Sequence, residues 1–274
     1  MKDMAFVFLA GMSAGVLFAQ GTTPPPPPSP MRTDVEPGIE VATIKPSKPD
    51  EGFSLGIGRG GPNVFTTTGT AVRTLVQFAN GVHPQQISGP AWIDSEHYDV
   101  TIKSDQEGSP SIPQARVMLR KLLTDRFNFV SHREKKELSV YAITISKGGP
   151  KLTPHPGPPS NQPSFGFGLG MLNIRNSTIT EFAGFLQANV MERPVVDQTG
   201  LTGRFDFTLK YTPDAAARLT NVPNAVSPPP PARDADAPPD LFTAFQQQLG
   251  LKLDSTKAVV DIIVVDKIEK PSAD

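Results

Sequence analysis

Cysteine is absent from this 274-residue sequence, and its absence removes a group of chemistries. The chain can form neither a disulfide nor a thiolate metal site, and it has no cysteine to which a lipid anchor could be attached. Histidine and tryptophan are scarce as well, with four copies and one copy. Any chemistry must therefore depend on carboxylates, hydroxyls, a few imidazoles and the basic side chains.

An excess of charge of either sign is also missing. Lys and Arg together number 26 and Asp and Glu 27, which leaves a formal charge of -1. Such a chain produces no strong field to attract nucleic acid or an anionic membrane. We therefore expect no nucleic-acid partner.

Proline and glycine, in contrast, are abundant. There are 30 prolines and 23 glycines, which indicates that much of the chain lies in loops and linkers. The length is sufficient for two ordinary domains, each with its own core.

The N-terminal segment has the pattern of a secretory leader. Lys2 precedes an uncharged, mostly apolar run from Ala5 to Ala19. A run of about 15 residues is too short to span roughly 30 Å of hydrocarbon, which favours a cleaved signal peptide over residues 1–19. We place the cleavage near Ala19–Gln20, with an uncleaved anchor as the alternative. Residues 20–38 follow as a proline-rich disordered tether, so we expect a secreted or periplasmic protein without stable membrane insertion.

An internal repeat is the strongest signal for the fold. A stretch of roughly 39 residues aligns with a later one when the chain is shifted by about 107 positions. The strand Tyr98–Lys103 then falls on Phe205–Lys210. The apolar face of one helix falls on that of another, with Val72, Leu75, Phe78 and Ala79 on Ile179, Phe182, Phe185 and Leu186.

Periodicity predicts the same order of elements in both copies. In the first, strands are expected at 39–44, 53–57, 64–68, 85–88, 98–103, 127–132 and 139–145, with a helix between Thr70 (its N-cap) and Gly81 and another at 113–126. In the second, strands are expected at 165–169, 172–174, 194–196, 204–211, 251–253 and 259–265, with helices capped by Ser177 and Asp240.

These elements predict an α+β fold made by tandem duplication of a β-α-β-β-α-β-β unit, with two helices on one face of a small mixed sheet. The first repeat covers residues 39–152, a linker covers 153–164, and the second repeat covers 165–271 with a mobile proline-rich insert at 213–239. The other face of each sheet must be solvated or packed against the sister repeat, and we favour an interface between the repeats.

Two local motifs suggest chemistry that their context argues against. The glycines of residues 56–61 precede a strand, whereas a phosphate-binding loop must run into a helix N-terminus, so we interpret them as a hairpin turn. Ser88 is followed by Gly89 and Pro90 with no helix behind them, which is unlike the elbow of a serine hydrolase. We predict no catalytic residues, and the chain is interpreted as not being an enzyme.

The four histidines, His83, His97, His132 and His155, form no helical pair and have no carboxylate-rich surroundings in sequence. We therefore predict no metal site and no cofactor, and we expect these side chains to be solvated or in loops.

Asp99 and Asp206 occupy matching positions in the two repeats. A symmetric pair of carboxylates can be catalytic, but only where glycine-flanked loops meet at the axis. Both of these residues lie within strands between bulky neighbours, so we expect outward-facing, solvated carboxylates. Trp92 is expected to cover the end of a core, with a partner-binding role as the alternative, and Arg126 to interact with a helix C-terminus.

Several segments occur in the order found in a known family. They include Ile39–Ser47, Ile87–Ile93, Leu123–Phe127, Lys147–Leu152, Arg193–Phe207 and Gln248–Leu253. Over about residues 39 to 271 the chain resembles the uncharacterised soil-associated protein family that is expanded in Acidobacteria and carries a domain of unknown function. The resemblance implies a secreted product, and relatives of the domain are fused to membrane metallopeptidases similar to beta-lactam sensors. It implies no activity, ligand or catalytic residue.

Each half is also similar in topology to the short N-terminal domain of secretins and TonB-dependent receptors, which implies a protein-contact module. We therefore expect a secreted or periplasmic, non-catalytic binding module whose partner is an unknown protein or envelope component. The alternative is a hydrolase or ligand-binding protein that acts on envelope glycan or peptide at the junction of the two repeats. The sequence identifies neither the partner nor the oligomeric state.

Overall fold

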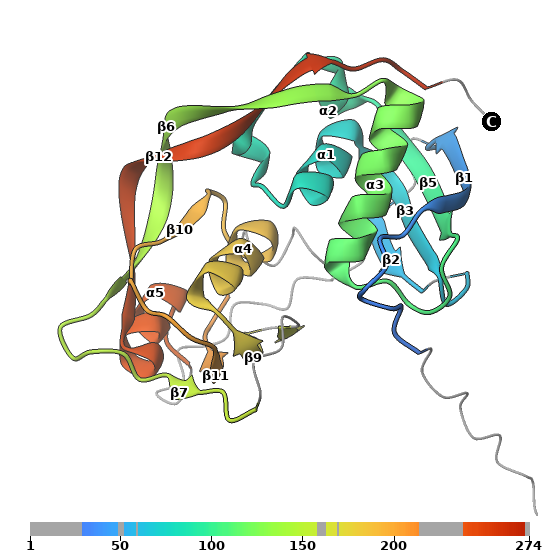
Figure 1. Ribbon diagram of the computed structural model, residues 1–274. Coiled ribbons are helices and arrows are strands. Elements are labelled where there is room, and N and C mark those ends of the chain that lie inside the picture. The colour runs from blue at the N-terminus through green and yellow to red at the C-terminus, as the bar shows by residue number, and fades with distance from the viewer. Residues whose placement is uncertain are drawn as a thin grey trace, which may run out of the picture.

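The computed structural model describes residues 29–48, 52–58, 60–157, 163–168, 170–213 and 238–271. Within these ranges the fold is mixed α+β, as predicted, with three four-stranded sheets and few helices. Figure 1 shows two lobes beneath an arch made by the two longest strands. We refer to residues 39–145 as the first half and to residues 153–267 as the second half.

The first half consists of a sheet with two helices on one face. The sheet is antiparallel and has the order β1-β5-β3-β2. Helices α1 and α3 pack on it and form one core with its inward side chains, while the short helix α2 packs at the edge of that core. The elements are β1 Ile39–Pro46, β2 Ser54–Ile57, β3 Val64–Ala71, α1 Val72–Asn80, α2 Trp92–Ser95, β5 His97–Ser104 and α3 Ile112–Phe127.

The second half has the same arrangement with shorter pieces. Its sheet has the order β7-β11-β9-β8, and all of its neighbouring strands are antiparallel. Helix α4 and a last helix that ends in a π-helical turn pack on one face of it. The elements are β7 Thr153–Pro154, β8 Ser164–Gly168, β9 Met171–Ser177, α4 Ile179–Asn189, β11 Phe205–Lys210, α5 Leu241–Ala244 and the π-helical turn Phe245–Leu249.

A third sheet joins the halves. Strands β6 (Val130–Ile145) and β12 (Leu251–Lys267) pair antiparallel over almost their full length and form the arch of Figure 1. Each also takes a short parallel strand from the opposite half, and the order is β10-β6-β12-β4. Strand β4 (Ile87–Ser88) follows a short 3₁₀ turn at Pro84–Gln86, and β10 is Val195–Asp197.

The exchange of strands means that each core is completed by the other half. Ile263 of β12 is 2% exposed and lies in the core of the first half. Tyr141 and Ile143 of β6 lie in the core of the second half. Because apolar burial is the main favourable term in folding, the two halves are energetically coupled.

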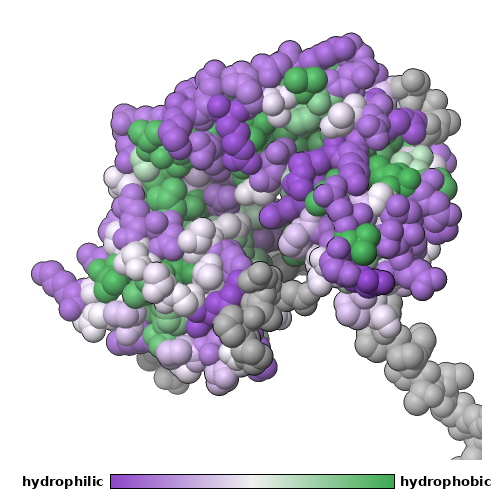
Figure 2. All heavy atoms as spheres, viewed as in Figure 1, coloured by the Kyte–Doolittle hydropathy of each residue, from purple (hydrophilic) through white to green (hydrophobic). Residues whose placement is uncertain are grey.

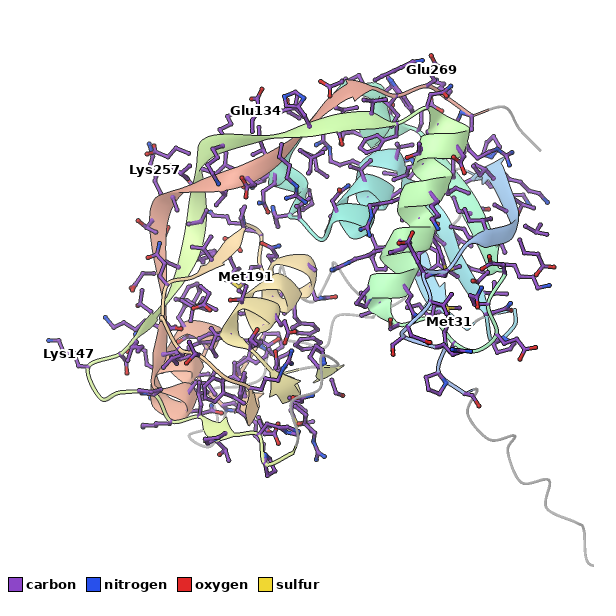
Figure 3. The ribbon with its side chains drawn as sticks, in the orientation of Figure 1. Met31, Glu134, Lys147, Met191, Lys257 and Glu269 are labelled. Atoms are coloured by element: carbon purple, nitrogen blue, oxygen red, sulfur yellow. The ribbon has the colours of Figure 1, made fainter. Side chains whose placement is uncertain are left out.

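The prediction of two closing strands in each half is wrong, since β6 and β12 are each continuous. Residues 131–138 carry five charged side chains and read as a loop in isolation. In the structure they face the oppositely charged residues of β12, with Lys135 Nζ 2.9 Å from an oxygen of Asp261 and Lys257 Nζ 3.4 Å from Glu137. Figure 3 labels Glu134 and Lys257 on these two strands. Cross-strand pairs of opposite charge favour a strand in such a sequence.

The ends of the helices differ from the prediction at two places. Ala71, and not Thr70, is the N-cap of α1, while Thr70 is buried in β3. Thr178, and not Ser177, caps α4, in a capping box with Glu181. Asp240 does cap α5, as predicted, by accepting a hydrogen bond from the N–H of Thr243 at 3.0 Å.

The outward face of each sheet is open, which corrects the expectation that it packs against the sister repeat. Thr101 and Lys103 are exposed on β5, as are Thr208 and Lys210 on β11. The halves meet instead through the third sheet and through side-chain contacts to backbone. The amide nitrogens of Gln187 and Gln85 donate to the carbonyls of Gly81 at 3.2 Å and Glu192 at 3.1 Å.

Segments that the sequence assigned to linkers take part in the structure where they are described. Met31 of the tether is 2% exposed and its N–H donates to Ser109. The linker supplies β7, which pairs with β11. Thr212 bridges to Asp240, so the two ends of the 213–239 insert lie side by side. The predicted signal peptide over residues 1–19 and residues 214–237 of the insert lie outside the described residues.

The two halves match in the order of their elements and in the order of strands within their sheets. The match extends to the exchanged pairs: Ile87 lies opposite Ile263, and Val195 lies opposite Tyr141. That the halves arose by duplication stays a prediction from the sequence.

Candidate functional site

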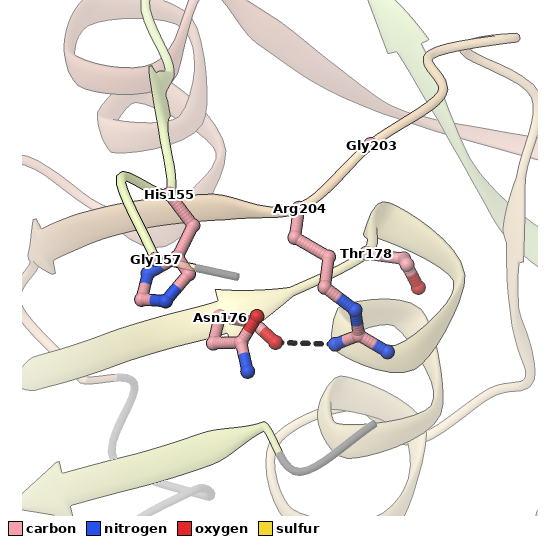
Figure 4. Close-up of a pocket in the computed structure, with 6 residues that line it drawn as sticks. All are labelled: His155, Gly157, Asn176, Thr178, Gly203 and Arg204. Atoms are coloured by element: carbon pink, nitrogen blue, oxygen red, sulfur yellow. Dashed lines mark hydrogen bonds between the residues drawn. The ribbon is translucent and has the colours of Figure 1, made fainter. Parts of the chain in front are cut away.

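A pocket of about 340 Å³ lies at one end of the sheet in the second half. Three segments form it: the residues after β7, the end of β9 with the N-cap of α4, and the residues before β11. Figure 4 shows the His155 ring and the Arg204 guanidinium on either side of Asn176. The lining residues are His155, Gly157, Asn176, Thr178, Gly203 and Arg204.

His155 is held by a carboxylate. Its Nδ1 lies 2.8 and 3.0 Å from the two oxygens of Asp206, and the two side chains are 23% and 29% exposed. Asp206 also accepts the backbone N–H of Asn176 at 2.7 Å. Because Nδ1 contacts Asp206, the Nε2 atom is the ring nitrogen left to bond another group.

The pKa of Asp206 reflects these contacts. Partial burial acts to raise it, but the N–H of Asn176 and the His155 ring outweigh burial and hold the pKa below its ordinary value. The carboxylate is therefore ionised at neutral pH.

Arg204 forms the other wall and is only 16% exposed. Its two terminal nitrogens reach the two carboxylate oxygens of Glu181 at 3.0 and 2.9 Å, and it also donates to the carbonyl of Asn176. Glu181 in turn accepts the N–H of Thr178 at 3.0 Å as part of the capping box. The guanidinium is thereby fixed in place by a two-point ion pair.

The equivalent end of the first half shows which contacts are shared. Asp99 accepts the N–H of Gly69 at 2.9 Å, as Asp206 accepts that of Asn176. Gly69 and Asn176 lie 107 positions apart and both have a left-handed backbone, with φ of 59° and 52°. Both stand where the register between neighbouring strands shifts. The two carboxylates therefore share a structural role, which is to bind the free N–H of a β-bulge.

The other contacts differ between the halves. The position of His155 is taken in the first half by Ser47, whose hydroxyl donates to Asp99 at 2.6 Å. The backbone shows the equivalence: the N–H of His155 donates to the carbonyl of Arg204, and the N–H of Ser47 donates to the carbonyl of His97. At the offset of 107 positions, His97 stands for Arg204 and Thr74 for Glu181. The histidine and the arginine–glutamate pair are thus specific to the second half.

The remaining histidines do not join this site. His83 is 6% exposed at the junction of the halves, where its Nδ1 accepts the N–H of Gln85, and burial lowers its pKa despite the Met191 backbone and Glu192. His132 lies on the arch between Glu134 and Asp266, at 2.9 and 2.8 Å, and these two carboxylates raise its pKa. The expectation was that the histidines are solvated or lie in loops, and His83 meets it as a buried loop residue at the N-cap of the 3₁₀ turn.

The other candidate residues have structural surroundings. The glycine-rich segment forms the β2–β3 hairpin, as predicted. Trp92 packs against the first core, as predicted, with Lys270 Nζ 5.9 Å from the centre of its ring. Arg126 lies in the last turn of α3. Asp99 and Asp206 are half-buried and bonded, so the prediction of solvated carboxylates is wrong.

The sequence did not single out Arg204 and Glu181. The available signal was the repeat itself, because at an offset of 107 positions these two residues replace His97 and Thr74 while their apolar neighbours are kept. Where aligned positions differ in residue type within an otherwise well-matched segment, the two halves differ in chemistry. Within the described ranges, no cluster of three or more His, Asp or Glu side chains is arranged to hold a metal ion.

Comparison with known proteins places the chain in a family. No curated protein and no solved structure matches it. In the described part of the chain, no helix is both long and apolar enough to cross a membrane. A family model described as a protein of unknown function (DUF3738) matches residues 73–268, which is most of the chain. The chain belongs to this DUF3738 family.

Proposed function

We propose that the protein is an exported, non-catalytic binding module whose ligand site is the pocket of the second half. The observation that carries the proposal is the difference between the halves. They share their sheet topology and their carboxylate–bulge contact, yet within the described residues only the second surrounds a pocket with a histidine and an arginine, each held by its own carboxylate. Pre-positioned polar groups at a pocket are the usual means of fixing a ligand's orientation.

The ligand class follows from the lining groups and from the expected location. His155 Nε2 and the remaining N–H groups of Arg204 suit a ligand that presents carbonyl, hydroxyl or carboxylate oxygens. The leader-like Ala5–Ala19 run and the resemblance to a secreted family support export, where envelope glycan and peptide offer such groups. The proposed partner is therefore an envelope component, bound as a free fragment or as part of a larger assembly.

The proposal can be tested with soluble muropeptides released from peptidoglycan, which carry both sugar and peptide. Saturation-transfer NMR should show binding to the wild-type protein, and His155→Ala should weaken it at least tenfold. Ser47→Ala removes the equivalent group from the first half and should leave binding unchanged. Equal losses in the two variants, or no binding of any muropeptide, would contradict the proposal.

A second candidate function rests on the His155–Asp206 pair. A carboxylate that holds Nδ1 and leaves Nε2 free is the geometry of a general base. The alternative is then a hydrolase acting on the same envelope material, with the pair in the second-half pocket and not at the junction of the repeats. Release of new reducing ends or amino groups by the wild-type protein, and its loss in His155→Ala, would favour this alternative over simple binding.

A further inference from the structure

Arg116 on α3 lies where the two halves meet, and none of the described residues forms an ion pair or hydrogen bond with its guanidinium. Its side chain is half-buried, and its Nε atom is fully buried with no hydrogen-bond partner among the residues that the structure describes. The guanidinium lies over the ring of Phe78, 5.8 Å from the ring centre. A buried donor that bonds nothing is costly, and native structures rarely keep one without a reason.

The charges around Arg116 increase this cost. Within the described residues no carboxylate lies at ion-pair distance from it, and the charged group that affects it is another cation, Arg120. Burial and this like charge both lower the pKa of Arg116. Arg120 is one helical turn away and donates to the carbonyl of Ala79 at 2.6 Å, near the C-terminus of α1. The negative end of that helix compensates part of the double positive charge.

The guanidinium of Arg116 packs against the backbone of Gly81. A side chain at residue 81 would meet the Arg116 guanidinium at 2.8–3.2 Å, so the guanidinium lies directly against this glycine. The carbonyl of Gly81 accepts the amide of Gln187, which belongs to α4 of the second half. Arg116 therefore lies where the halves come together, and Figure 2 shows a hollow between the two lobes.

We propose that Arg116, supported by Arg120, binds the carboxylate or phosphate group of a small ligand at the junction of the two halves. A planar guanidinium offers paired N–H groups that match the paired oxygens of both anions. An anion there would bond the terminal N–H groups of Arg116, for which the described residues supply no acceptor, and would neutralise the paired cations. This site is separate from the pocket of His155, so it stands or falls independently of the proposed function.

The arginine Nε–H signals of the ¹⁵N-labelled protein give a direct test. The Arg116 signal is identified by its absence in Arg116→Gln, and the protein is titrated with sodium phosphate or sodium acetate against sodium chloride at constant ionic strength. We expect a saturable shift of the Arg116 signal with a weak dissociation constant of about 1–10 mM. Saturation by phosphate alone identifies a phosphate site, and saturation by acetate alone identifies a carboxylate site.

Control variants separate binding from structure. In Arg116→Gln the Arg120 signal serves as the reporter, and its saturable shift should be lost. The melting temperature of this variant without added anion should stay at or above that of the wild type. Arg133→Gln, on an exposed part of β6, should leave binding unchanged. Should Arg116→Gln fail to fold, Arg116→Lys keeps the charge but not the paired donors, and weaker binding is expected. An Arg116 signal that responds to both anions as it does to chloride would overturn the proposal.

Discussion

The two halves share a scaffold and differ in what it carries. Both have a four-stranded antiparallel sheet with the same strand order, helices on one face, and a bulge whose free N–H is bound by an aspartate. In the first half this aspartate bonds a serine hydroxyl, and in the second it bonds a histidine ring beside a pocket. The shared contact is structural, so the chemistry specific to one half is better evidence for function than the symmetric carboxylates are.

The same comparison shows that neither half is self-contained. Strand β12 of the second half buries Ile263 in the first core, and β6 of the first half buries Tyr141 in the second core, at positions 122 residues apart in the chain. Each core therefore contains side chains that a strand of the arch brings from the other half. A disturbance in one half should reach the other through the arch, while a change in a half-specific contact should stay local.

The largest expected effect comes from breaking the exchanged core. Ile263→Ala should lower the free energy of unfolding by about 2–5 kcal/mol, because it opens a cavity in the first half from a strand of the second. Urea titration followed by Trp92 fluorescence reports on the first half, and circular dichroism reports on the whole chain. Val259→Ala, on the same strand but 62% exposed, should change stability by less than about 0.5 kcal/mol. An unchanged Trp92 transition in Ile263→Ala would show that the exchange carries no coupling.

A smaller effect is expected from the ion pair that exists only in the second half. Glu181→Gln and Arg204→Met should each cost about 1–3 kcal/mol, because each leaves a half-buried charged partner with fewer bonds. A double-mutant cycle should give a coupling energy of about 1 kcal/mol or more. The matched pair of the first half, Thr74→Ala and His97→Ala, should show a coupling near zero. Equal coupling energies in the two halves would remove the asymmetry on which the proposed site rests.

The smallest expected effect, and the one that depends on pH, concerns Asp206. The pKa of Asp206 in the folded protein lies below the ordinary value of 3.8. The ionised carboxylate therefore stabilises the fold at pH values above 3.8, and this contribution is lost as the pH falls through the folded pKa. Asp206→Asn should therefore cost about 1 kcal/mol at neutral pH. The difference from the wild type should vanish in strong acid. Melting temperatures across the acid range check this, and a difference that persists at the lowest pH would contradict it.

Most of the secondary structure could be predicted from the sequence because local patterns determine it. The apolar face of residues 72–80, the glycine with left-handed backbone at position 81 and the alternation at 98–103 each specify one element. The arch could not be predicted in this way. Residues 131–138, five of them charged, form a strand because β12 pairs with their backbone and supplies counter-charges from more than a hundred positions away.

The site was predictable only in part. The match of Asp99 and Asp206 was visible, but whether they are solvated depends on Gly69 and Asn176, whose N–H groups are freed by bulges in pairing. The pocket needs three segments to meet, and that meeting depends on β7, which the sequence placed in a linker. The two residues of β7 pair there because β11 has an open edge, and no local pattern in the sequence indicates such an edge.

By itself the sequence determined the α+β class, the helices with their apolar faces, and the correspondence between the two halves, because these follow from the spacing of apolar side chains. The tertiary structure alone decided that the halves exchange strands, that the open faces of the sheets are solvated, and that His155 and Arg204 face one pocket. Those features depend on contacts between residues distant in the chain, and such contacts leave no periodic pattern in the sequence.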